Sequence, residues 1–124
     1  MYWKRLKLER YMATKPEVKV KKQIKDLLVK HKAYYFTPVT SGFGSSGVPD
    51  FVACIKGRFV GIEAKAGKGK TTALQDKNLA DIMNSGGIAI VVNEHGLEDL
   101  ALLLNVGLPT QGATFDMLLK GVLE

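Results

Sequence analysis

Apolar side chains first recur at helical spacing between residues 15 and 31, where lysines fill much of the opposite face. This period predicts an amphipathic helix. Thr14 is expected to cap its start, with Pro16 in the first turn and Glu17 reaching back to the cap. The apolar positions are Val20, Ile24, Leu27 and Leu28.

Strand-like runs follow this helix. Residues 33–39 are rich in aromatic and β-branched types, and Pro38 favours a peripheral position in a sheet. The Gly- and Ser-rich residues 41–47 are expected to form a mobile loop. Residues 50–55 and 58–66 are joined through Lys56-Gly57, which predicts a hairpin.

The second half of the chain alternates between helical and strand-like patterns. A helix is expected over residues 73–85, where it ends at two glycines. The continuous apolar run 88–93 predicts a strand buried on both faces and paired in parallel after a crossover helix. Two short helices are expected over 97–104 and 114–123. The order α-β-β-β-α-β with a helical tail indicates a mixed α/β fold.

Length and composition indicate a single domain spanning residues 1–124. No apolar run approaches the roughly 20 residues that cross a bilayer, so we expect no membrane association. The basic N-terminal residues lack the apolar stretch of a secretory signal, which favours an intracellular, cytoplasmic location. The single cysteine, Cys54, lies in an apolar run and is expected to be buried.

The charge is unevenly distributed. The net charge of +6 divides into +11 for residues 1–77, with 17 Lys/Arg and 6 Asp/Glu, and −5 for residues 78–124, with 1 and 6. A basic excess confined to one part of the chain favours a polyanionic partner, and nucleic acid is the expected one.

Strand parity brings two acids and a lysine together. If residues 56 and 57 form the hairpin loop, Asp50 lies opposite Glu63, and a loop of residues 57 and 58 places it opposite Lys65. Either register puts all three on one face of the sheet, whereas a three-residue loop would separate them. Opposed carboxylates repel, and Mg²⁺ or Mn²⁺ would relieve that repulsion through hard oxygen ligands.

Pro49-Asp50 followed by Glu63-Ala64-Lys65 resembles the motif of the PD-(D/E)xK nucleases. Its surroundings, over residues 17 to about 94, are similar to the VRR-NUC family, the virus-type replication-repair nucleases. The shared features are a first helix with an acid, a Gly-rich loop before the motif, and a helix that ends in Gly-Gly before an apolar strand. The resemblance implies a restriction-endonuclease-like αβββαβ core with a mixed central sheet and a short helical C-terminal tail.

The resemblance also implies roles for individual residues. Asp50, Glu63 and the Ala64 carbonyl are the implied metal ligands, and the acid of the first helix, Glu17, approaches the metal. Lys65 is implied to orient the attacking water and to stabilise charge on the phosphate. Gln75 is implied to help hold the site, although the Ser-Pro that often precedes this glutamine in the family is missing here.

The implied activity is a Mg²⁺- or Mn²⁺-dependent endonuclease of a virus or phage that acts on branched DNA, Holliday junctions especially. The family resemblance implies a homodimer without a nucleotide cofactor. Residues 97–123 are apolar and poor in Lys/Arg, so we expect them to form part of the dimer interface. Lys68, Lys70 and Ser41 are candidate contacts to DNA phosphates.

Alternatives remain open from the sequence. Glu17 and Gln75 could instead act only as capping-box partners of Thr14 and Thr72. The stretch "AKAGKGKT", residues 64–71, has the spelling of a permissive phosphate-binding P-loop, but its strand is one arm of a hairpin instead of a central parallel strand. A basic DNA-binding module without catalysis is the third class, and it leaves the acidic pair unexplained.

Overall fold

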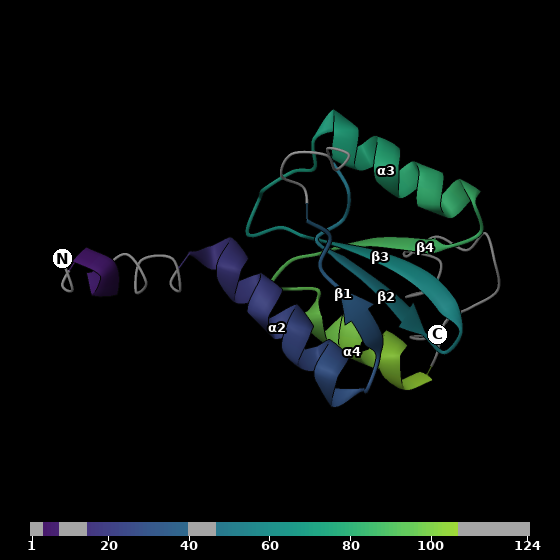
Figure 1. Cartoon of the computed structure of the whole chain (residues 1–124), viewed down its shortest axis with the longest axis horizontal. Coiled ribbons are helices and arrows are strands. Elements are labelled where there is room, and N and C mark those ends of the chain that lie inside the picture. The colour runs from purple at the N-terminus through teal and green to yellow at the C-terminus, as the bar shows by residue number, and fades with distance from the viewer. Residues whose placement is uncertain (1–3, 8–14, 40–46, 107–124) are drawn as a thin grey trace.

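The computed structural model describes residues 4–7, 15–39 and 47–106. A four-stranded sheet with the strand order β1-β2-β3-β4 lies at the centre (Figure 1). β1–β2 and β2–β3 pair antiparallel, and β3–β4 pair in parallel, which confirms the predicted mixed α/β class. The elements are α2 (Pro16–Lys30), β1 (Tyr34–Phe36), β2 (Phe51–Ile55), β3 (Arg58–Ala64), α3 (Ala73–Asn84), β4 (Ile88–Val92) and α4 (Leu97–Val106).

The hairpin between β2 and β3 fixes the register of the sheet. Ile55 pairs with Arg58, so the loop consists of Lys56 and Gly57, with φ angles of 49° and 82°. Two successive positive φ angles are typical of the type I′ turn, whose twist matches that of the flanking strands. The first of the two predicted registers is therefore confirmed, and Phe51 pairs with Ile62 at the far end of the hairpin.

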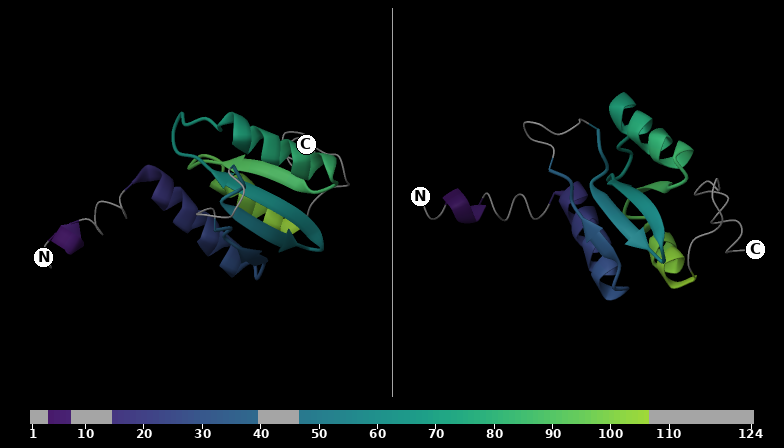
Figure 2. Two further views of the ribbon diagram at one scale, coloured as in Figure 1. Left: turned by 45° about the horizontal axis from the view of Figure 1, so that its top comes forward. Right: turned by 45° about the vertical axis from the view of Figure 1, so that its right-hand side comes forward.

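One face of the sheet, together with α2 and α4, forms the hydrophobic core (Figures 1 and 2). α2 buries the face predicted from its apolar period, and α4 packs beside it. The core residues from the helices are Val20, Ile24, Leu28, Leu100, Leu103 and Leu104. These three leucines of α4 lie in the core of their own chain, whereas Leu97 and Leu102 are half-buried. Residues 114–123 lie outside the described residues.

α3 lies on the opposite face as the crossover between β3 and β4 (Figure 2). Gly61 of β3 permits this close approach. A Cβ atom at this position would lie 2.6 Å from Ile82 Cδ1 of α3 and 3.0 Å from Pro49 Cγ. The absence of a side chain at Gly61 thus brings α3 close to the strand that carries Glu63.

Two burial predictions were wrong for the same reason. Val91 of β4 is 41% exposed, so β4 is not buried on both faces, and Cys54 of β2 is exposed. Both side chains lie on the α3 side of the sheet, as the strand pairing requires. α3 covers this side incompletely, and none of the residues in Ala73–Asn84 is fully buried.

Some element boundaries also differ from those predicted. The N-cap of α2 is Lys15, so the expected Thr14 cap was wrong. β1 is limited to three residues at the edge of the sheet, and β3 ends at Ala64, two residues early. Residues 4–7 form a helical turn. Across the parts of the chain described here, no helix is long and apolar enough to cross a membrane.

Candidate active site

Two acidic side chains meet where β2 begins and β3 ends. Because Phe51 pairs with Ile62, the preceding residue, Asp50, comes opposite Glu63 on the face that α3 covers. Glu63 is only 1% exposed. Asp50 Oδ2 accepts a hydrogen bond of 2.9 Å from the Ala64 backbone N–H. The Asp50 carboxylate thus binds the end of β3 and is held close to Glu63.

Gln75 fixes one oxygen of Glu63 and caps α3 at the same time. Its Nε2 donates a 3.0 Å hydrogen bond to Glu63 Oε1, while its Oε1 accepts from the Thr72 N–H at 2.9 Å. The capping box is completed by the Gln75 N–H, which donates to Thr72 Oγ1 at 3.2 Å. The two roles considered for Gln75 are therefore compatible, because the bond from Thr72 turns the NH₂ group toward Glu63.

The second oxygen of Glu63 has no partner. Oε2 is buried and makes no hydrogen bond with any of the described residues. Burial raises the pKa of Glu63 from 4.5 to about 8, and the Asp50 carboxyl adds to the rise through hydrogen bonding and charge repulsion. The positive charges of Lys65 and Lys21 lower this pKa in part. A buried carboxylate oxygen without a partner is costly, and a bound cation would remove that cost.

Two lysines flank the acidic pair. Lys65 follows β3 directly, and its backbone N–H donates to the Val92 carbonyl at 3.0 Å. Lys21 comes from α2, where its Nζ lies 3.5 Å from Asp50 Oδ1. Lys21 was not predicted from the sequence. The available signal was its position one turn after Glu17, because residues four apart share a helix face.

Glu17 does not join the acidic pair. Its side chain is exposed at the start of α2, and the described residues hold no cluster of three or more His, Cys, Asp or Glu side chains suited to a metal ion. Asp50 and Glu63 remain as a two-carboxylate site. The Ala64 N–H points toward Asp50. Because the N–H and the carbonyl of a strand residue point to the same neighbouring strand, the Ala64 carbonyl also faces the side of Asp50.

These residues fit Mg²⁺ or Mn²⁺. Mg²⁺ usually keeps several waters and binds through one or two carboxylates plus substrate phosphates, so a third acid is not required. The orphaned Oε2 of Glu63 and the opposed Asp50 carboxylate provide the hard oxygen donors for such an ion.

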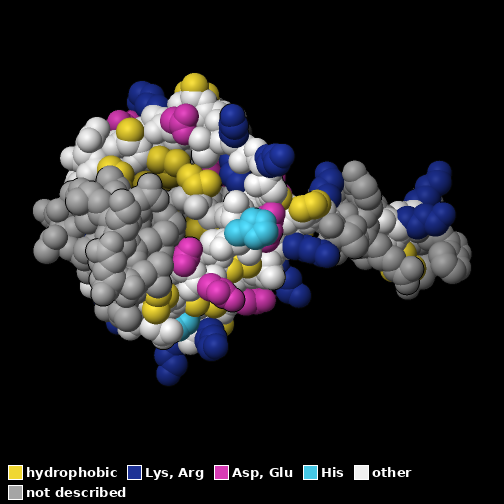
Figure 3. All heavy atoms as spheres, turned by 180° about the vertical axis from the view of Figure 1, so that it is seen from behind, with side chains coloured by type: hydrophobic (Ala, Val, Ile, Leu, Met, Phe, Trp, Pro, Cys, Tyr) yellow, Lys and Arg dark blue, Asp and Glu magenta, His cyan; other side chains and the backbone are white. Residues whose placement is uncertain are grey.

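The loop between β3 and α3 carries positive charge beside this pair. Lys68 and Lys70 are exposed, and Ser41 lies outside the described residues. The Gly67 N–H donates to both carboxylate oxygens of Glu94, at 2.9 and 3.0 Å, which lowers the pKa of Glu94. In the view of Figure 3, most of the Lys and Arg side chains lie on the side of the molecule from which the N-terminal residues extend.

The same bonds argue against a P-loop. A phosphate-binding loop needs free backbone N–H groups, but the Gly67 N–H is taken by Glu94 and the Gly69 N–H by the Ala66 carbonyl, at 2.9 Å. α3 begins only after its N-cap, Thr72, so Lys70 lies ahead of the helix. β3 pairs antiparallel with β2 on one side, as the hairpin predicted.

Comparisons with known proteins leave the chain without an assigned family. No family model matches it, and no curated protein matches it.

Proposed function

We propose that the chain is a metal-dependent endonuclease that hydrolyses phosphodiester bonds in DNA. One observation carries this proposal: the buried Glu63, whose Oε2 lacks a partner, lies opposite Asp50 and beside Lys65 at one end of the sheet. A purely structural role would leave the buried Oε2 without a partner, because Gln75 satisfies Oε1 only.

The roles of the residues follow from their positions. A Mg²⁺ or Mn²⁺ ion held by Asp50, Glu63 and the Ala64 carbonyl would stabilise negative charge on the phosphate and supply a reactive water. Lys65 offers an ammonium group beside this position, suited to the charge that develops on the phosphate during cleavage. Gln75 holds Glu63 in place through Oε1 and leaves Oε2 available.

The substrate follows from charge and from what the motifs lack. Lys68 and Lys70 suit phosphate contacts, and the sequence contains no recognised base-reading motif. DNA recognised by its structure is therefore the proposed substrate, and the resemblance to the virus-type replication-repair nucleases adds that it is branched DNA of a virus or phage, in the cytoplasm of the host cell. The homodimer, built partly from residues 97–123, stays a prediction from the sequence.

A cleavage panel tests the proposal. Duplex, flap, splayed and four-way DNA are incubated with the full chain in Mg²⁺, in Mn²⁺ and in EDTA. The proposal expects metal-dependent cleavage, strongest on branched DNA, and no cleavage in EDTA. DNA binding without cleavage under every metal condition would assign the chain to the non-catalytic binding class instead.

Gln75→Leu is expected to lower both Mg²⁺ affinity and cleavage by about 10- to 100-fold, because Glu63 loses the partner that orients it. Calorimetry of metal binding measures the first effect and single-turnover cleavage the second. Thr72→Ala is the matched control. It removes the cap acceptor and costs about 1 kcal/mol of stability, but leaves the backbone N–H that holds the Gln75 amide. Equal losses in both variants would contradict a positioning role for Gln75.

Lys70→Ala is expected to weaken DNA binding in EDTA and to reduce the slope of log affinity against log salt by about one unit. The physical reason is the release of one fewer counterion from the DNA backbone. Fluorescence anisotropy at several salt concentrations measures the slope. Lys30→Ala, in the last turn of α2, provides the control with an exposed lysine removed elsewhere. Identical slopes for Lys70→Ala and the wild type would exclude the phosphate contact.

A further inference from the structure

The sheet face that carries Glu63 continues beyond α3. α3 packs against β3 and β4, and the outward side chains of β1 and β2 have no described helix above them (Figures 1 and 2). Tyr34, Phe36 and Phe59, which we call the aromatic face, are 74%, 51% and 51% exposed. Several exposed rings on one sheet face are unusual for a surface without a binding role.

The strand pairing connects the aromatic face with the candidate active site. Directly paired residues lie side by side on one face, and successive rows are two residues, or about 7 Å, apart. Phe36 is therefore one row from the acidic pair. Toward the site, the rows are Tyr34–Cys54–Phe59, then Phe36–Val52–Gly61, then Asp50–Glu63.

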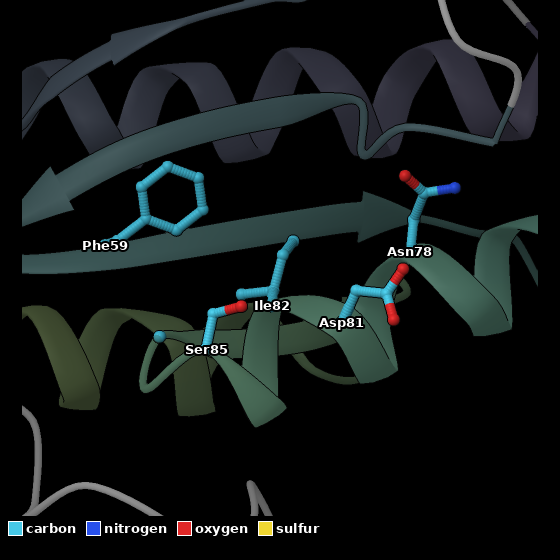
Figure 4. Close-up of a pocket in the computed structure, with 6 residues that line it drawn as sticks. Phe59, Asn78, Asp81, Ile82 and Ser85 are labelled. Atoms are coloured by element: carbon cyan, nitrogen blue, oxygen red, sulfur yellow. The ribbon is translucent and has the colours of Figure 1, made fainter.

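Two hollows border the aromatic face and meet at Phe59. A shallow hollow of about 130 Å³ lies over β1, β2 and β3, between Tyr34, Phe36 and Phe59. A second cavity, of about 330 Å³, lies between Phe59 and α3, where Ile82 provides an apolar wall (Figure 4). Its rim is polar, with side chains that could meet the edges of a base: Asn78, Asp81 and Ser85.

We propose that the aromatic face stacks unpaired nucleobases of the DNA strand whose phosphodiester lies against Asp50 and Glu63. This inference rests on the proposed nuclease function and specifies its substrate as DNA with a single-stranded segment beside the cut. The flat faces of bases in a duplex are hidden by their neighbours, whereas unpaired bases can stack on exposed aromatic rings.

Charge favours DNA over a protein partner on this face. The adjoining lysines, Lys21 and Lys65, surround the acidic pair, and residues 1–77 carry a net charge of +11. Single-stranded binding surfaces combine such basic groups, which follow the backbone, with aromatic rings that receive the bases. Aromatic rings are common at protein interfaces too, so the basic charge beside the rings is the observation that favours DNA.

Tyr34→Leu and Phe36→Leu test the proposal, because leucine keeps the apolar character but removes the aromatic ring. The affinities of the full-length variants for a single-stranded oligonucleotide and for a duplex of equal length are measured in EDTA, which prevents cleavage. Each variant is expected to lose about tenfold in affinity for the single strand, with duplex affinity and salt slope unchanged. A fluorescent purine analogue in the single strand should be quenched by the wild type and less by Phe36→Leu. Val29→Ala, an exposed apolar residue of α2, is the matched control.

Single-strand affinity that survives both leucine variants would overturn the stacking proposal. So would loss of self-association in these variants, measured by light scattering, because that result would assign the face to a second copy of the chain. The metal-dependent cleavage panel separates this failure from failure of the nuclease function. Absence of cleavage with stacking intact would refute the nuclease function, and cleavage without stacking would refute only the inference about the aromatic face.

Discussion

Glu63→Gln is expected to lower the single-turnover rate of DNA cleavage in Mg²⁺ by at least about a thousandfold. The substitution keeps the size of the side chain but replaces the carboxyl group, with its unpartnered Oε2, by an amide that cannot become an anionic metal ligand. Asp50 is then the one carboxylate left at the site, and a single acid holds a divalent ion weakly. DNA affinity in EDTA near neutral pH should be unchanged, because the raised pKa of about 8 leaves Glu63 uncharged there and the substitution removes no positive charge.

Asp50→Asn and Lys65→Ala are expected to give losses of similar size. Residues that act as one catalytic unit are strongly non-additive, so combining Asp50→Asn with Glu63→Gln should cost little more than either change alone. Glu98→Gln, an exposed acid of α4 on the other side of the sheet, is the control and should cleave at the wild-type rate. Cleavage by Glu63→Gln above about a tenth of the wild-type rate would refute the assigned site.

Glu63→Gln is also expected to stabilise the protein when metal is absent. The folded-state pKa of Glu63 is about 8, against 4.5 for the ordinary side chain. The folded state therefore holds a proton that the unfolded chain releases, and the contribution of Glu63 to stability is fully present below pH 4.5. This contribution is lost as the pH rises toward 8, with a slope of at most about 1.4 kcal/mol per pH unit.

Urea unfolding in EDTA between pH 5 and pH 8 measures this dependence, with the pH range taken from the raised pKa of Glu63. The wild type should lose free energy of unfolding across the range more steeply than Glu63→Gln, so the variant should be the more stable protein at the alkaline end. Mg²⁺ should restore stability to the wild type at that pH and have much less effect on the variant. Parallel curves for the two proteins would show that Glu63 is not destabilised by its burial.

The hairpin and its acidic pair could be predicted from the sequence because both depend on local rules. A two-residue turn at Lys56-Gly57 fixes the register, and the strand period of two then carries Asp50 to the position opposite Glu63. The bond between Gln75 and Glu63 was also within reach, since a capping box places Gln75 on the first turn of α3.

The features that could not be predicted from the sequence depend on how the elements pack together. Periodicity identifies the buried face of α2, but not which of its turns approaches Asp50. Glu17 was predicted from the family resemblance, and Lys21, one turn further on, was overlooked. The exposure of Cys54 has a similar origin. Its apolar neighbours in the sequence indicate a strand, whereas its burial depends on whether a helix covers that part of the sheet.

The order in which the strand pairs are connected has a consequence for folding. β2 and β3 are joined by two residues, and hairpins of this kind form within microseconds. β3 and β4 meet only after the whole crossover through α3 has closed, and such non-local pairing is slower. We therefore expect Asp50 and Glu63 to come together early, while water still surrounds both carboxylates. Glu63 then loses its surrounding water only when α3 docks. Metal ions present during refolding would therefore change the rate of that docking step.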